Sequence, residues 1–341
     1  MEQVRIGMMG FGRVGRQLYR LAEQDDRFQV AAISDIGQPH ILHHLLTKTL
    51  ARAVKVKLEG NYLVSESGRT RLMSADRPSE VPWDVFGVDV VIDVTGKFRS
   101  SRDLSPHLDN GARRVITSVL PDDDVDRVLI FGVNDDQASA DDRIVSAGSA
   151  STSAAALALK IITDAYPIDH ASVTSVHEYT SDQVLEDYAG PDYRRSRSGA
   201  KNIIPNTTPA RIWVPRVLPA GEGKLSGDAM NVPVQTGSML DLTVAFSDPS
   251  VDTAAVNATF EAAAKARPDL IAVTHDPIVS SDVRGCRQSL LVDLGATLKA
   301  GSRLVKVLAW HESLGHAARI LDVAALYHEL DGAGVQTREA S

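Results

Sequence analysis

Short apolar runs alternate with helical repeats through the first half of the chain. Residues 4–9 and 28–35 each form an apolar run of strand length, and between them residues 16–21 continue at helical spacing. Such alternation predicts a parallel sheet with covering helices. Further buried strands are expected at 88–96, 112–118, 127–134 and 143–146, and a hairpin of 55–58 with 62–65 at a sheet edge.

The pattern changes at residues 146–153, a small and hydroxyl-rich octapeptide that leads into an obvious helix start at 154–160. Residues 171–180 then alternate with period two, as a half-buried strand does. More strands are expected at 224–233, 239–246 and 304–311, and an amphipathic helix at 251–266. A closing helix at 314–330 should return to the first domain. Because helix N-termini carry unpaired N–H groups and partial positive charge, the octapeptide could hold an anion or a nucleophile.

A glycine-rich turn joins the first predicted strand to the first predicted helix, and an acid, Asp35, ends the second strand 20 residues after Gly15. This context makes the turn a dinucleotide-binding loop. Asp35 would bind the adenosine ribose hydroxyls and repel a 2′-phosphate, which favours NAD over NADP. The alternative is a glycine-rich turn without a ligand. The predicted cofactor residues are Gly10, Phe11, Gly12, Arg13, Val14, Gly15, Asp35, Thr95, Gly96 and Ser118.

Composition and charge exclude several classes of function. The chain has 341 residues, 43% hydrophobic and 23% charged, with a net charge of −8. This charge gives no excess of basic residues that would bind nucleic acid or an anionic membrane. The chain also has no apolar run of about 20 residues that could span a bilayer. The single cysteine, Cys286, excludes an intramolecular disulfide and a cysteine-based metal site. We expect no metal, no signal peptide and a cytoplasmic location.

Seven segments follow in the same order along the chain as in a known family: 10–16, 176–183, 194–197, 201–205, 285–293, 306–310 and 319–322. Over nearly its full length the chain resembles the glyceraldehyde-3-phosphate dehydrogenase family. The resemblance implies a Rossmann NAD-binding domain (1–149 and 316–341) and an α/β catalytic domain (150–315) with a mixed, largely antiparallel sheet. It also implies a homotetramer in which the loop 181–204 makes subunit contacts near the cofactor.

In the family a cysteine attacks an aldehyde, the thiohemiacetal passes hydride to NAD, and phosphate releases the thioester, with a histidine as acid and base. His177 occupies the histidine position, but the nucleophile position is Ala150. The resemblance assigns substrate and phosphate binding to Ser149, Ser151, Thr180, Arg195, Thr208 and Asn231, and nicotinamide orientation to Ser313.

Three further departures from the family pattern accompany Ala150. Asn231 replaces an arginine, Pro209 replaces a glycine, and Ser313 replaces an asparagine in a segment that is one residue short. Ala150 is either natural in a divergent branch or an engineered replacement. Neither Cys286, which we place in a structural strand, nor a flanking serine is expected to act as the nucleophile.

Three functions therefore stay open. The first is an NAD-dependent oxidoreductase for an aldehyde or sugar phosphate, with inorganic phosphate as a candidate second ligand, that is inactive or impaired because position 150 is alanine. The second is an NAD-binding pseudoenzyme with a regulatory or scaffold role. The third is a non-covalent oxidoreductase that uses His177 as acid and base.

Overall fold

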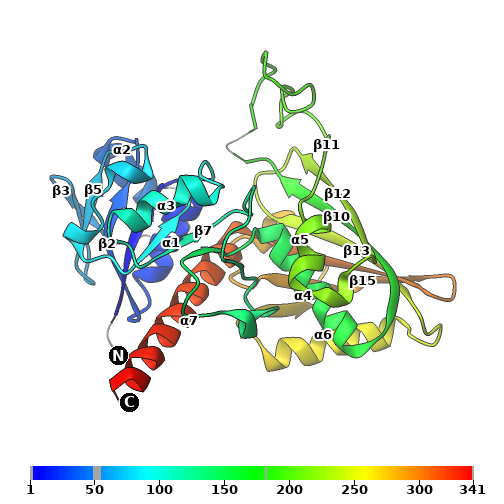
Figure 1. Ribbon diagram of the computed structural model, residues 1–341. Helices are drawn as coiled ribbons and strands as arrows, with labels where there is room; N and C mark the ends of the chain where they lie inside the picture. Colours follow the sequence, from blue (N-terminus) through cyan, green and yellow to red (C-terminus); the bar gives the residue numbers. More distant parts are fainter. Residues whose placement is uncertain (1–2, 49–54, 181–182, 340–341) are drawn as a thin grey trace. The chain divides into compact units, whose positions relative to one another are not determined.

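The computed structural model describes residues 3–48, 55–180 and 183–339, and the side chains of the last helix as far as residue 332. Residues 181–182, the start of the loop expected to make subunit contacts, lie outside this range. The chain divides into two compact units, Met1–Ser149 with Ala317–Ser341, and Ala150–His316. Each unit has its own sheet (Figure 1).

The first unit is built on a sheet of nine strands in the order β3-β4-β5-β2-β1-β6-β7-β9-β8. β1 pairs in parallel with both β2 and β6, as in a doubly wound Rossmann sheet, so the Rossmann prediction is confirmed. The predicted hairpin also forms, since β3 and β4 pair antiparallel at the sheet edge. The strands are β1 Val4–Met9, β2 Phe28–Ser34, β3 Lys57–Glu59, β4 Tyr62–Val64, β5 Arg69–Met73, β6 Val90–Asp93, β7 Arg114–Thr117, β8 Arg127–Val128 and β9 Ile144–Ser146.

The strand expected at 127–134 is wrong beyond Val128, where β8 ends. The Asn134 side chain accepts a hydrogen bond from the Ile130 N–H (2.8 Å) and donates one to the Val128 carbonyl (3.0 Å). Asp135 accepts from the Gly132 N–H at 2.7 Å. These side chains satisfy the backbone groups that a longer strand would pair, and so they close a turn.

Four helices belong wholly or mainly to the first unit: α1 Arg13–Ala22, α2 Pro39–Lys48, α3 Ser101–Asp109 and α7 Ser313–Glu339. α7 is the expected closing helix, and from Ala317 onward it is part of the first unit. The Tyr327 hydroxyl donates to Asp142 (2.7 Å), and Asp331 pairs with the buried guanidinium of Arg114 (2.9 Å). These contacts hold α7 against the Rossmann sheet.

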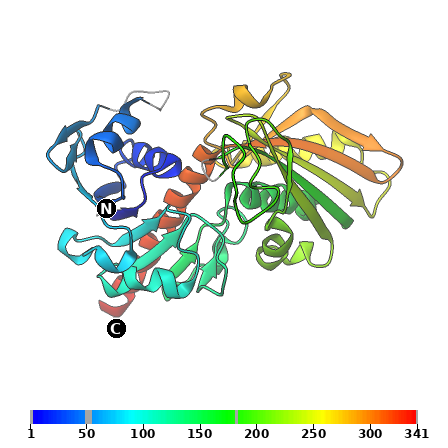
Figure 2. The same ribbon diagram turned by 90° about the horizontal axis from the view of Figure 1, so that it is seen from above.

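The second unit has a sheet of seven strands in the order β11-β12-β10-β13-β16-β15-β14. Four neighbouring pairs are antiparallel and two are parallel, so the sheet is mixed and largely antiparallel, as expected. The orange arrows in Figure 2 are the long antiparallel pair β15–β16. The strands are β10 Ile168–Glu178, β11 Ile204–Asn206, β12 Leu225–Val232, β13 Ser238–Phe246, β14 Ile271–Thr274, β15 Leu290–Ala300 and β16 Leu304–His311.

Three helices cover this sheet: α4 Ala150–Ala165, α5 Ala210–Val217 and α6 Thr253–Ala266. α4 packs on β10, β13, β15 and β16, α5 packs on β12, and α6 packs on β14 and β15. The strict burial alternation of β13 follows from this one-sided cover, because only one face of the strand meets the helices. Within the described part of the chain, no helix is long and apolar enough to cross a membrane.

Candidate functional site

The glycine-rich loop between β1 and α1 has the geometry of a dinucleotide-binding turn. Gly10 takes a positive φ of +94°, which side-chain-bearing residues rarely adopt. A Cβ on Gly15 would lie 2.6 Å from the Gly10 carbonyl oxygen, so this position must be glycine for the helix to pack on the strand. A Cβ on Gly12 would meet nothing within 4 Å. Gly12 therefore leaves an open approach to the first turn of α1, and helix N-termini are suited to bind phosphate groups.

Asp35 lies directly beside this loop. One carboxylate oxygen accepts a hydrogen bond from the Phe11 N–H at 2.6 Å, and the other accepts from the Gly37 N–H at 2.7 Å. Each oxygen keeps a further lone pair that can accept a hydrogen bond from a ribose hydroxyl. These residues fit the adenosine half of NAD.

The carboxyl ends of β6 and β7 complete this edge of the sheet. The Thr95 hydroxyl donates to Asp93 at 2.7 Å, and the Ser118 N–H donates to the Asp93 carbonyl at 2.9 Å. Thr95 N lies within 3.0 Å of the position of a Cβ on Gly10. The structure thus gathers Gly10, Asp35, Thr95 and Ser118 at the carboxyl edge around the switch between β1 and β6. Gly96 follows with φ +69°, Arg13 is exposed and Val14 is half-buried.

In the second unit, a row of polar side chains crosses one end of the helix-covered sheet face. Asn231 on β12 lies in register with His177 on β10. The antiparallel pairing of β10 with β13 places Ser238 on β13 at the other side of His177. Ser238 in turn lies in register with His311 on β16. We call these four residues the polar row. The next positions on the same face are buried and mostly apolar: Ala229, Ser175, Leu240 and Ala309. The side chains that could contact a ligand on this face of the sheet therefore lie at the end that carries the polar row.

His311 was not foreseen from the sequence. Its ring lies 5.9 Å from that of His177, edge to face at 75°. Burial, with the charges of His177 and His316, lowers the pKa of His311 to about 3. The His311 imidazole is therefore neutral at physiological pH. The available signal was that residues 304–311 form a strand whose last residue is polar.

Asn231 is connected to Arg195 through a residue that the sequence analysis missed. The Asn206 amide donates to the Asn231 side-chain oxygen at 3.0 Å, and Arg195 Nη2 donates to the Asn206 side-chain oxygen at 3.2 Å. Asn206 is the last residue of β11, which pairs with β12. The structure thus brings Arg195 and Asn231 to the same end of the sheet as His177.

Ala150 is the first residue of α4, and Ser149 directly precedes it. Gly148, with φ +77°, donates its N–H to the Ser146 hydroxyl at 3.1 Å and turns the chain into the helix. Ser151 is buried in the first turn. Because α4 packs on β10 and β16, it lies against the strands that carry His177 and His311.

The remaining predicted residues are less closely connected to the polar row. Thr208 is buried, and its hydroxyl accepts from the Ala210 N–H (3.2 Å) at the start of α5, where Pro209 is the N-cap. Thr180 is exposed, and its N–H donates to the Gln183 side chain at 3.1 Å. Ser313 begins α7 with a buried hydroxyl that has no hydrogen-bond partner among the described residues.

The strand expected around Cys286 is wrong. Cys286 lies in the loop between a 3₁₀ turn, Ser280–Val283, and β15. Gly285 takes φ +88°, and the Cys286 N–H donates to the Val283 carbonyl at 3.0 Å, so a turn forms here. Burial raises the pKa of the Cys286 thiol, which disfavours the reactive thiolate.

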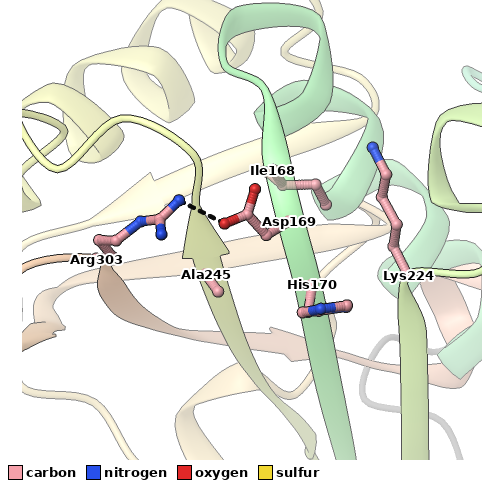
Figure 3. A pocket seen from close by; sticks show the side chains of 6 residues that line it. All are labelled: Ile168, Asp169, His170, Lys224, Ala245 and Arg303. Atoms are coloured by element: carbon pink, nitrogen blue, oxygen red, sulfur yellow. Dashed lines mark hydrogen bonds and ion pairs between the residues drawn. The ribbon is translucent and has the colours of Figure 1, made fainter.

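A cavity of about 550 Å³ lies at the opposite end of the second sheet (Figure 3). Its walls include Asp169 and Arg303, which form an ion pair at 2.5 Å, together with His170 and Lys224. None of the residues predicted for the site lines it. The described residues also contain no group of three or more His, Cys, Asp or Glu side chains that could hold a metal ion.

Comparisons with known proteins agree with this description of both units. Residues 4–101 match the model of the glyceraldehyde 3-phosphate dehydrogenase NAD binding domain, and residues 149–313 match that of the C-terminal domain. Glyceraldehyde-3-phosphate dehydrogenase of Kitasatospora aureofaciens is 38% identical over 330 residues, which cover 94% of this chain and 98% of the relative. The Mycobacterium leprae enzyme is 37% identical (95% and 98% covered), and glyceraldehyde-3-phosphate dehydrogenase 1 of Bacillus subtilis is 36% identical (94% and 97%). The chain belongs to the glyceraldehyde-3-phosphate dehydrogenase family of NAD-dependent oxidoreductases.

Proposed function

We propose that this chain binds NAD and a small aldehyde or sugar phosphate but forms no acyl-thioester, so that it lacks the covalent catalysis of its family. The observation that carries the proposal is Ala150 at the first position of α4. A methyl group has no lone pair and cannot attack a carbonyl. By the same family relationship, we propose that the chain assembles as a homotetramer.

No other side chain is a good substitute for the missing thiol. Cys286 is the only cysteine in the chain; it lies in a loop, and its thiol pKa is raised. Ser149 and Ser151 flank position 150, but a serine becomes a nucleophile only beside a base that is itself oriented by a third group. In strand register His177 lies beside an amide, that of Asn231, and a hydroxyl, that of Ser238.

The substrate is proposed to differ from that of the relatives. Asn231 offers an amide where the family has a guanidinium, so a charge-assisted hydrogen bond to a phosphate is replaced by a weaker neutral one. Pro209 has no N–H to donate to an inorganic phosphate. Arg195 and Thr208 stay available for an anion.

A non-covalent oxidoreductase is the second candidate, favoured by His177 in the polar row. In that reaction bound NAD⁺ would supply the hydride acceptor, and His177 would take the proton of the alcohol hydroxyl as the alcohol becomes a carbonyl compound. Substrate-dependent NADH formation by the unaltered chain should then disappear in His177→Ala, and its survival would reject this route. If no metabolite is turned over while NAD still binds, the regulatory pseudoenzyme becomes the better description.

Asp35→Ala tests cofactor binding. Calorimetric titration of the unaltered chain should show tighter binding of NAD than of NADP. Hydrogen bonds to a charged group contribute about 1.5–3 kcal/mol, so the substitution should weaken NAD binding roughly tenfold or more and narrow the preference over NADP. Asp136→Ala, at an exposed acid of the same unit, should change neither affinity. Equal affinities for the two cofactors before any substitution contradict the assignment of Asp35.

A further inference from the structure

We propose that His311 is a specificity-determining residue of the substrate site, whose imidazole binds an uncharged oxygen, a hydroxyl or a carbonyl, of the ligand beside His177. The inference rests on the proposed function in one respect, namely that the polar row is where a small carbonyl compound binds. It goes further by naming the residue that selects the ligand and the kind of group it selects.

The first observation is that both ring nitrogens of His311 are buried without a hydrogen-bond partner in the described structure, while the whole residue is only 2% exposed. A neutral imidazole always has one N–H donor and one lone-pair acceptor. Leaving both unpaired in the interior costs free energy, and such groups are rare in folded proteins. A histidine in this state is therefore suited to pair with a group that arrives from outside the chain.

The second observation concerns the polar neighbours of His311. It lies in register with Ser238, whose hydroxyl oxygen accepts from the Glu178 N–H at 3.3 Å and whose hydroxyl hydrogen can still be donated. Ser313, two residues further along the chain, has a buried hydroxyl that is also unpartnered in the described structure. Together with His177, these groups offer donors and acceptors for an oxygen atom.

The third observation is the absence of fixed positive charge in the polar row itself. Asn231, Ser238 and the buried, neutral His311 are all uncharged. A phosphate or carboxylate moved against His311 would lose its hydration without gaining an ion pair. A hydroxyl or carbonyl oxygen loses less on burial and finds the hydrogen bonds it needs.

A packing role for His311 makes a different prediction for ligand binding, which allows the two roles to be separated. Phenylalanine has a ring that can keep the edge-to-face contact with His177, and it removes the two unpaired nitrogens. If His311 only fills space, His311→Phe should stabilise the chain and leave ligand binding unchanged. If His311 binds the ligand, the same substitution should stabilise the chain and weaken binding.

The experiment uses the full chain loaded with NAD, with D-glyceraldehyde as the uncharged probe and glyceraldehyde 3-phosphate as the charged one. We expect His311→Phe to weaken D-glyceraldehyde binding about tenfold and to raise the melting temperature. His311→Gln, which keeps a donor and an acceptor, should bind D-glyceraldehyde within about threefold of the unaltered chain. The ¹⁵N chemical shifts of the His311 ring should change when D-glyceraldehyde is added.

Unchanged D-glyceraldehyde affinity in His311→Phe overturns the proposal, and so does the failure of the unaltered chain to bind D-glyceraldehyde at all. The NAD titration of the same samples separates this failure from a failure of the proposed function. NAD affinity should be the same in the unaltered chain and both variants, whereas a chain that does not bind NAD refutes the proposed function itself.

Discussion

Ala150→Cys should produce a fast-reacting thiol and restore aldehyde-dependent NADH formation. A thiol at the first position of α4 faces the positive end of a 16-residue helix, which lowers its pKa and raises its thiolate fraction at neutral pH. Made together with Cys286→Ser, so that only one thiol is present, the variant should react with iodoacetamide roughly ten times faster at pH 7 than Cys286 does in the unaltered chain. NADH formation should then be measured with a panel of aldehydes, NAD and phosphate.

Ala150→Ser in the same background is the matched control. Serine has the same side-chain shape with a smaller oxygen in place of sulfur, and its hydroxyl stays protonated at neutral pH, so this variant should not form NADH at a comparable rate. The proposed role of position 150 would be contradicted if the introduced thiol were no more reactive than that of Cys286 and no aldehyde tested gave NADH.

Asp331→Ala should cause a large loss of stability although it lies outside the site. The Arg114 side chain is 1% exposed, and Asp331 binds both of its terminal nitrogens, at 2.9 and 3.2 Å. Removing one partner of a buried pair leaves the other charge without compensation, which typically costs about 3–5 kcal/mol. The Asp142 and Ala140 carbonyls, which also accept from Arg114, do not replace a carboxylate.

Thermal unfolding followed by circular dichroism measures this effect, and a fall in melting temperature on the order of 10 °C is expected. Asp122→Ala is the control in the same unit, because the Arg99–Asp122 pair has side chains 41% and 66% exposed. An exposed pair contributes about 0–1 kcal/mol, so the control should shift the melting temperature little. Equal shifts in the two variants would mean that the buried pair does not anchor α7.

The cofactor half of the molecule could be predicted from sequence because its determinants are local. The glycine loop joins one strand to one helix, and Asp35 ends the very next strand, so a short stretch contains most of the geometry. The structure adds only what holds Asp35 in place, namely the N–H groups of Phe11 and Gly37.

The polar row could not be predicted in full, because it depends on the pairing of strands that are far apart in the chain. His177 and His311 approach each other only because β13 lies between β10 and β16 in a particular register. Asn206 joins Arg195 to Asn231 for the same reason. A change of one residue in any of these registers would turn the side chains to the other face of the sheet.

Cys286 shows a different limit of structure prediction from sequence. The sequence around Cys286 predicts a strand. The positive φ of Gly285 and the hydrogen bond from the Cys286 N–H to the Val283 carbonyl form a turn instead, so Cys286 lies in a loop. Backbone conformation at a single glycine decided the local structure there. For position 150, by contrast, the sequence identifies the residue directly, and the structure adds that Ala150 begins α4.

Intact-protein mass spectrometry tests the central claim most directly. The unaltered chain, saturated with NAD, is mixed with the aldehyde that Ala150→Cys oxidises fastest, quenched rapidly in acid and weighed, with Ala150→Cys as the positive control. We predict that the unaltered chain keeps its unmodified mass while the variant gains the mass of one acyl group. An acyl adduct on the unaltered chain would contradict the proposal that this chain lacks covalent catalysis.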